Sequence, residues 1–454
     1  MSEALREQGL SISAATLSRV ESEGQRSAAV IDGYTDVLGL PGGSLGAVID
    51  GVCRGFPYAP PALADHRPAT LETFSRAYDA VAVDRPTAGA WLTFARMHAE
   101  PAGFGLPATV MESLVQVLAD EVGRGVTASR LTRHEALGRL AESPYGAMTL
   151  AIIRERVEDP DNQTIYDLTS VLSDHPSPEL TAWACRLLAS PSLFHVRGAS
   201  YALQGMLVHG GLSLASWRDV VPLVRTAQDA AHGHDEKLTA IGQVVAALPP
   251  ALRPDLRAAG VRAPARPSSQ PWSRTRGNPH YLAATAIARA ACQELDQPDE
   301  PLLERLLFEA CFELRGVRMA VATWTLLSSP FAAALARAII RNTSWPDEAC
   351  RVAATRVAAA VNDGEPLIGV EALLDEEALF GAATTIIGRS GGRLPDDALA
   401  RGLAGDETTV RQTLYALGMA GDPRLTALAE EGAQPPAISR AARWWLTRGG
   451  RVLA

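Results

Sequence analysis

From about Leu71 to the end of the chain, apolar residues recur at the spacing of amphipathic helices, and Pro, Gly or Asp interrupts the pattern every 10 to 20 residues. Several interruptions share one form: a short acidic, Ser- or Pro-containing turn, then Val-Arg or a similar pair, then a nearby Ala. Two such arginines, Arg318 and Arg351, are 33 positions apart, and Arg411 follows 60 positions later. A unit of about 30 residues is typical of paired-helix solenoids.

This pattern resembles that of HEAT repeats, in which a turn residue and an arginine of the inner helix tie neighbouring units together. The resemblance is spread over most of the chain and implies an α-solenoid of helix pairs. Tetratricopeptide repeats are the nearest alternative, but their W…L-G…Y spacing is not apparent. The resemblance implies structural roles for four arginines, Arg197, Arg318, Arg351 and Arg411.

The composition agrees with an all-α fold. Apolar residues make up 47% of the chain but aromatic residues only 6%, so Ala, Leu and Val carry the core. Ala and Leu favour helices, and small Ala side chains let helices pack closely. A chain of 454 residues also exceeds what one hydrophobic core usually organises. We therefore expect several domains or an extended repeat array.

The charge and the rare residues exclude some functions. A formal charge of −9 disfavours a protein that coats nucleic acid along its whole length, because such binding needs a continuous basic surface. Lys237 is the only lysine, and it does not follow a glycine-rich loop, which excludes a Walker-type ATPase. The five cysteines form no C-x-x-C pair, so we expect reduced thiols, no zinc site and a cytoplasmic protein.

The chain shows no signal for export or for membrane insertion. No basic and then apolar leader opens it, so we do not expect a secreted protein. The stretch from Met319 to Ala336 carries no charge, but Ser328-Ser329-Pro330 divides it. Because Pro ends one helix and starts another, this stretch predicts a buried helix hairpin and no membrane span.

The first fifty residues predict three short helices: Ser2 to Gln8, a second helix capped by Ser13, and Ala28 to Leu38. Gly9-Leu10-Ser11 supplies a tight turn between the first two, as in a helix-turn-helix, and Gly39 closes the third. The segment from Ser13 to Glu21, with Thr16-Leu17-Ser18-Arg19 at its centre, resembles the recognition-helix signature of lambda-repressor-like regulators of the xenobiotic-response-element type. The resemblance continues through Gly24 and Arg26 to Tyr34-x-x-x-Leu38-Gly39-Leu40 and covers about a tenth of the chain. It implies DNA contacts by Ser13, Thr16, Ser18 and Arg19.

Three observations keep an alternative open. Ala14 and Ala15 stand where family members often carry base-reading side chains, and the family's first helix would precede Met1. Residues 1–50 also carry three arginines against seven carboxylates, a formal charge of −4 that repels phosphate. The same helices could instead pack on the solenoid or form a homodimer without binding DNA.

One basic segment lies in the middle of the chain. Residues 251–281 carry six arginines and one aspartate, so the rest of the chain has a formal charge of −14. The segment is either a solvated linker between two helical halves or a binding site, in which Trp272 offers a stacking surface. The candidate partner-binding residues are Arg262, Arg266, Trp272, Arg274 and Arg276.

No motif indicates catalysis. Gly42-Gly43-Ser44-Leu45-Gly46 matches the serine-hydrolase elbow in letters, but a predicted helix precedes it instead of a strand. His134-Glu135 lacks the second histidine of a zinc protease, since Gly138 occupies that position. His232 and His234 are too few for a closed zinc site, and a solvated loop explains them. We therefore expect no catalytic residue, no metal and no cofactor.

These observations predict a bacterial DNA-binding transcriptional regulator whose helical repeats receive a protein partner or a signal. The alternative is a protein-protein interaction scaffold with a degenerate helix-turn-helix. The expected organisation is a partial helix-turn-helix over residues 1–50, a Pro-rich linker over 51–70, helical repeats over 71–250, an Arg- and Pro-rich linker over 251–280 and HEAT-like repeats over 281–454.

Overall fold

The computed structural model is helical throughout the residues that it describes, which are 1–23, 27–55, 70–99, 105–262, 277–313, 316–430, 432 and 434–453. These residues form 25 α-helices and two 3-10 helices, and they contain no β-strand. The predicted all-α class is confirmed. The chain divides into two compact units, one comprising residues 1–154 with 453–454 and the other residues 155–452, and the boundary falls inside α9.

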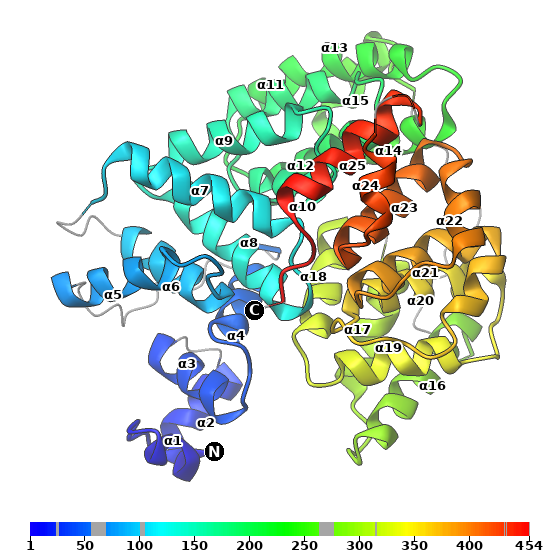
Figure 1. Cartoon of the computed structure of the whole chain (residues 1–454). Helices are drawn as coiled ribbons and strands as arrows, with labels where there is room; N and C mark the ends of the chain where they lie inside the picture. Colours follow the sequence, from blue (N-terminus) through cyan, green and yellow to red (C-terminus); the bar gives the residue numbers. More distant parts are fainter. Residues whose placement is uncertain are drawn as a thin grey trace. The chain divides into compact units, whose positions relative to one another are not determined.

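Unit 1 comprises α1 to α8 and the first part of α9 (Figure 1). Helix α1 packs on α3, α3 on α4 and α4 on α8, while α6 lies against both α5 and α8. The side chains of Trp91, Phe94, Leu118 and Leu137 form its fully buried centre. The helices are α1 Ser2–Glu7, α2 Ala14–Glu23, α3 Ala28–Val37, α4 Ser44–Gly55, α5 Leu71–Val81, α6 Ala88–Ala99, α7 Ala108–Val122, α8 Thr127–Glu142 and α9 Gly146–Glu158.

The first half of unit 2 is built from alternate helices in two layers. Helix α12 packs between α10 and α14, while α13 packs between α11 and α15. The first layer buries Val171, Leu203 and Val244. The helices are α10 Ile165–Ser173, α11 Pro178–Leu187, α12 Leu193–His209, α13 Leu214–Ala230, α14 Asp235–Ala247, the 3-10 helix η1 Pro250–Leu252 and α15 Arg253–Ala258.

The second half of unit 2 ends in a similar alternation, in which α23 packs between α21 and α25. Trp445 of α25 is buried so tightly against Gly418 that a Cβ atom there would collide with the indole. The elements are α16 Pro279–Glu294, α17 Pro301–Phe312, α18 Gly316–Leu327, α19 Ala332–Arg341, α20 Glu348–Val361, the 3-10 helix η2 Glu371–Asp375, α21 Glu377–Arg389, α22 Asp396–Leu403, α23 Glu407–Ala420, α24 Arg424–Leu428 and α25 Pro436–Arg448.

Local chemistry sets many of the helix starts. The side chains of Ser27, Ser177, Asp347 and Asp406 each accept a hydrogen bond from a backbone N–H of the following first turn. Such caps satisfy donors that have no partner inside the helix. Proline occupies the first turn of several other helices, where its missing N–H costs nothing. These prolines are Pro279, Pro301 and Pro436.

Two expectations about linkers need correction. Residues 51–55 are the last turns of α4 and do not belong to an extended connector, because Val48 and Ala47 bury this helix against the protein. Residues 253–258 form α15, in which Leu256 is buried, so the Arg- and Pro-rich segment begins as a helix. The second predicted linker also ends too late, because α16 begins at Pro279. Residues 56–69 and 263–276 of the two predicted linkers lie outside the described residues.

The uncharged stretch from Met319 to Ala336 forms α18 and α19, which are separated at the Ser328-Ser329-Pro330 interruption as predicted. Among the described helices, no single one is both long and apolar enough to cross a bilayer. Only α18 and α19 taken together reach that length, and they bend by 105° at their junction.

Candidate functional site

The N-terminal helices share a small apolar core. Leu5 of α1, Leu17 of α2 and Val30 of α3 are buried against one another, and Tyr34 packs beside them. Between α1 and α2, Gly9 adopts a positive φ of 82°, which glycine tolerates without steric cost. This core fixes one face of α2 inward and leaves the opposite face in solvent.

The four predicted DNA-contacting residues lie on α2 or at its start. Ser13 Oγ accepts a hydrogen bond from the backbone N–H of Thr16 at 3.1 Å and lies 2.9 Å from Thr16 Oγ1. These two hydroxyl groups therefore cap the helix and satisfy each other. Ser18 and Arg19 are exposed, so they are the better placed of the four to reach a ligand.

The outward face of α2 carries small side chains, the cation of Arg19 and, one turn later, the exposed carboxylate of Glu23. Ala15, Ser18, Arg19 and Ser22 are all exposed, and Ser22 Oγ donates to the carbonyl of Ser18 one turn earlier. Glu21 is also exposed, and its carboxylate accepts a hydrogen bond from the hydroxyl of Tyr34. Burial, together with this carboxylate, raises the pKa of Tyr34 to about 12, so the hydroxyl remains a donor at neutral pH. Small side chains allow a duplex or another helix to approach closely.

A buried charge network joins the N-terminal helices to the rest of unit 1. Asp50 of α4 and Glu135 of α8 are 2% and 1% exposed. Arg139 Nε lies 2.7 Å from Glu135 Oε1, and Arg139 Nη2 lies 2.9 Å from Asp50 Oδ2. Arg54 Nη1 donates to Glu135 Oε1 at 3.3 Å, and Arg54 Nη2 also pairs with this carboxylate. Burial alone would raise the pKa of Glu135, but the two arginines outweigh it and lower the pKa to about 2.

Sequence reasoning missed this network. Asp50 with Arg54, and Glu135 with Arg139, are opposite charges four residues apart on helices, a pattern that is ordinary on a solvated face. Helix α8 is itself rich in polar residues, so its sequence gave no local sign that Glu135 is buried. The ion pair between Arg54 and Glu135 spans 81 positions, so the partner could not be read from local spacing.

The predicted partner-binding segment is described only in part. Arg262 is exposed, and its backbone makes two hydrogen bonds of 2.9 Å with the side chain of Gln228. That contact anchors the end of the α15 turn to α13. The other candidates, Arg266, Trp272, Arg274 and Arg276, lie outside the described residues.

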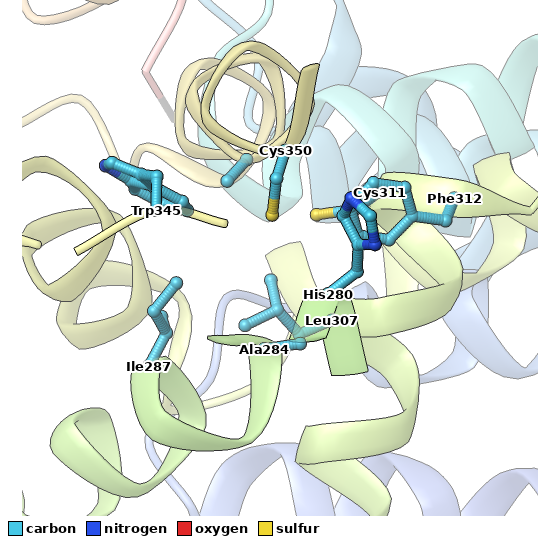
Figure 2. A pocket seen from close by; sticks show the side chains of 9 residues that line it. His280, Ala284, Ile287, Leu307, Cys311, Phe312, Trp345 and Cys350 are labelled. Carbon is cyan, nitrogen blue, oxygen red and sulfur yellow. The ribbon is translucent and has the colours of Figure 1, made fainter. Parts of the chain in front are cut away.

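A small cavity in unit 2 has chemically interesting walls but little room (Figure 2). It holds about 10 Å³, roughly one water molecule. The sulfur atoms of Cys311 and Cys350 face the same space, with His280 beside Cys311. Burial raises the pKa of Cys311 and raises that of Cys350 to about 12, and protonated thiols are weak nucleophiles. His280 Nε2 lies 2.8 Å from Asp347 Oδ2, which holds the ring at the wall.

The motifs that resemble catalytic signatures have structural surroundings. Ser44 begins α4 and is 2% exposed, so its hydroxyl is not presented to solvent. His134 is buried in α8 beside Glu135. His232 and His234 are exposed in the turn before α14. Within the described ranges, no group of three or more His, Cys, Asp or Glu side chains is arranged to hold a metal ion.

The four arginines assigned to the HEAT-like ladder have different partners. Arg197 of α12 pairs with Glu236 of α14 at 3.0 Å, and Arg351 of α20 binds both carboxylate oxygens of Glu376, just before α21. Both contacts link an element to a following one. Arg411 instead donates to the carbonyl of Asn162 and lies 4.2 Å above the ring of Phe194. Arg318 is half-buried on α18.

Comparison of the chain with models of protein families, with curated proteins and with solved structures finds no match. The outward face of α2 is therefore interpreted from its own geometry.

Proposed function

We propose that this protein is a cytoplasmic, bacterial DNA-binding regulator that reads DNA with α2 and receives a protein partner on its helical repeats. The observation that carries the first part is the outward face of α2, where Ser18 and Arg19 project among small side chains above the Leu5–Leu17–Val30 core. A recognition helix must enter the major groove, and short side chains beside one arginine suit that approach.

Electrostatics limits how this binding could work. The formal charge of −4 on residues 1–50 opposes phosphate, so Arg19 and the N-terminal end of α2 must supply most of the local attraction. A single such contact gives weak affinity and a shallow salt dependence. Two copies on neighbouring half-sites would double the contacts, which is why a homodimer fits the proposal.

The test is retention of a pool of duplex DNA carrying a randomised stretch of about 20 base pairs, measured with the full chain at low and at physiological salt. We expect retention at low salt that falls as salt rises. Arg19→Glu should reduce it at least about tenfold, because the reversed charge repels phosphate. Arg85→Glu is the matched control, since Arg85 is 94% exposed on another part of unit 1. Absence of any salt-dependent retention by the unaltered chain would refute DNA binding.

The alternative is a scaffold whose N-terminal helices do not bind DNA, and the acidic charge of residues 1–50 favours it. Both proposals assign a protein partner to the helical repeats. Support comes from the alternation of α10, α12 and α14 with α11, α13 and α15, because HEAT-like solenoids stack helix pairs in this way. Stacked inner helices expose side chains from many units to one extended ligand. The DNA-retention assay separates the two proposals directly.

A further inference from the structure

The loop between α20 and η2 carries the most exposed large apolar side chain of the described residues. Ile368 is 95% exposed, whereas the next value, that of Leu71, is 64%. Isolated apolar residues on a surface are common and by themselves need no explanation. Ile368 differs because the surrounding backbone is held in place.

The backbone around Ile368 is fixed from both sides. Leu367 and Val370 are buried, at 5% and 6% exposure, and the N–H of Val370 donates to the carbonyl of Leu367 at 3.3 Å. Gly369 supplies the positive φ of 92° that this turn requires. Ile368 is therefore presented at the tip of a closed turn and cannot easily fold back onto the core.

The preceding residues are anchored as well. The side chain of Asn362, which is 1% exposed, accepts a hydrogen bond from the N–H of Gly364 at 2.9 Å. Arg451 donates to the carbonyl of Gly364 at 3.0 Å. These contacts connect the loop to the C-terminal part of unit 2.

The loop and η2 are acidic in sequence, and the arginines that reach them from other elements, Arg451 and Arg401, donate to the main-chain carbonyls of Gly364 and Leu374. Residues 362–377 contain six carboxylates and no basic residue. Two arginines near this segment already pair with carboxylates. Arg351 binds Glu376. Arg341, which follows the Ile340 that lies close to Gly369, binds Glu294. The carboxylates with exposed side chains that flank Ile368 are Glu365, Glu371, Asp375 and Glu377.

We propose that Ile368 is an anchor that inserts into an apolar pocket of a partner protein, and that lysine or arginine side chains rim this pocket. The proposal rests on the protein-partner half of the proposed function and names the chemistry of that partner. Charge complementarity selects it, because a neutral or acidic rim would face the four carboxylates at an electrostatic cost. Burial of the isoleucine supplies the contact energy, and the acidic surround supplies orientation and a faster encounter.

The partner is identified by photocrosslinking from the full chain in its native cells, with p-benzoylphenylalanine in place of Ile368. The control places the same group at Leu302, which is 55% exposed on α17. We expect one protein to crosslink at position 368 and not at position 302, through a peptide that contains apolar residues beside Lys or Arg. The proposal would be overturned by a crosslink to a second copy of this chain or to an acidic or uncharged surface. It would also be overturned if the crosslinking yield at position 368 did not exceed the yield at position 302.

Binding of the purified partner then tests the energetics. Ile368→Ala should weaken binding roughly 10- to 100-fold, as expected when one buried aliphatic contact is lost. Glu365→Lys combined with Glu371→Lys should weaken it at low salt and less so at high salt, whereas Leu302→Ala should leave it unchanged. Binding that is insensitive to Ile368→Asp, in a variant with an unaltered melting temperature, would also overturn the proposal.

The two proposals fail independently. Ile368→Asp should retain DNA as the unaltered chain does, and Arg19→Glu should bind the partner as the unaltered chain does. A chain that binds its partner through Ile368 but retains no DNA would refute the regulator and leave this inference standing. The opposite pattern would refute the inference alone.

Discussion

Several polar side chains of this protein are buried where their protonation state affects stability, and His98 of α6 is the simplest case. It is 3% exposed and surrounded by the ring edges of Phe74, Phe94 and Tyr145, with centroid distances of 5.4, 4.7 and 5.4 Å. Burial lowers the pKa of His98 from 6.5 to about 4. The ring is therefore neutral in the folded protein at pH 7.

This depressed pKa predicts acid sensitivity. In the unfolded chain His98 takes up a proton near its ordinary pKa. Protonation therefore stabilises the unfolded state relative to the folded state as the pH falls below about 6.5. The loss of stability grows until the pH reaches about 4, where it amounts to roughly 3 kcal/mol. His98→Leu should flatten this part of the curve when the free energy of unfolding is measured by denaturant titration. His232→Leu, at an exposed site, is the control. Curves of equal slope for His98→Leu and the unaltered protein would contradict the assignment.

At the scale of elements, the contact of α4 with α8 depends on charges buried between them. Glu135→Gln removes the carboxylate that holds both Arg54 and Arg139. We expect a loss of about 3 kcal/mol at neutral pH, because breaking a buried pair leaves the remaining charge poorly compensated. Denaturant unfolding monitored by circular dichroism measures this loss.

The matched control for that substitution is Glu142→Gln. Glu142 lies 3.6 Å from the same Arg139 but is 42% exposed, so its removal should cost less than about 0.5 kcal/mol. The low pKa of Glu135 adds a second signature. Its stabilisation is complete above its ordinary pKa of about 4.5 and is lost as the pH falls toward 2. Equal effects of the two substitutions would show that the network contributes nothing beyond surface pairing.

The elements that sequence reasoning predicted well are those fixed by neighbouring residues. Ser13 caps α2, and Gly39, with a positive φ of 62°, follows the end of α3, both as expected from local backbone chemistry. The buried face of α8 was harder to predict from the sequence. Thr132, Arg133 and Glu135 are buried on this helix, although polar side chains usually mark a solvated face. Thr132 donates to Ala128 within α8, but Arg133 and Glu135 also have partners outside this helix. Arg133, for example, bonds Glu121 of α7 and the carbonyl of Pro86, 47 positions away.

The same reasoning explains what could be predicted of the candidate sites. The exposure of Ser18 and Arg19 follows from helical spacing once Leu17 is placed in the core. The exposure of Ile368 could not be predicted from the sequence. Leu367-Ile368-Gly369-Val370 is an apolar run, and such runs normally predict burial. Only the turn geometry separates the buried members of this run from the exposed one.

At the scale of the whole molecule, contacts within unit 2 join residues that are far apart in the chain. Arg411 of α23 donates to the carbonyl of Asn162, 249 positions earlier, and Arg440 Nε of α25 lies 2.8 Å from Asp161 Oδ1. Burial lowers the pKa of Arg411, but Tyr166 and Glu407 favour its charged form. The late helices of unit 2 therefore contribute to the surroundings of its first helix, which favours cooperative unfolding of the unit.

Two compact units, each with its own buried core, predict two calorimetric transitions for the full chain. Glu135→Gln should lower only the melting temperature of unit 1. Arg411→Ala should lower only that of unit 2, by a few degrees, because it leaves the Asn162 carbonyl without its buried donor and removes the cation from the Phe194 ring. Arg440→Ala is the control within unit 2, since Arg440 is 49% exposed and its pair should contribute little. If both Glu135→Gln and Arg411→Ala shifted one shared transition, the two units would unfold as a single cooperative domain, and a signal from a partner bound at Ile368 could reach α2 through the folded chain. Separate transitions would mean that α2 and Ile368 do not share one cooperative folding unit.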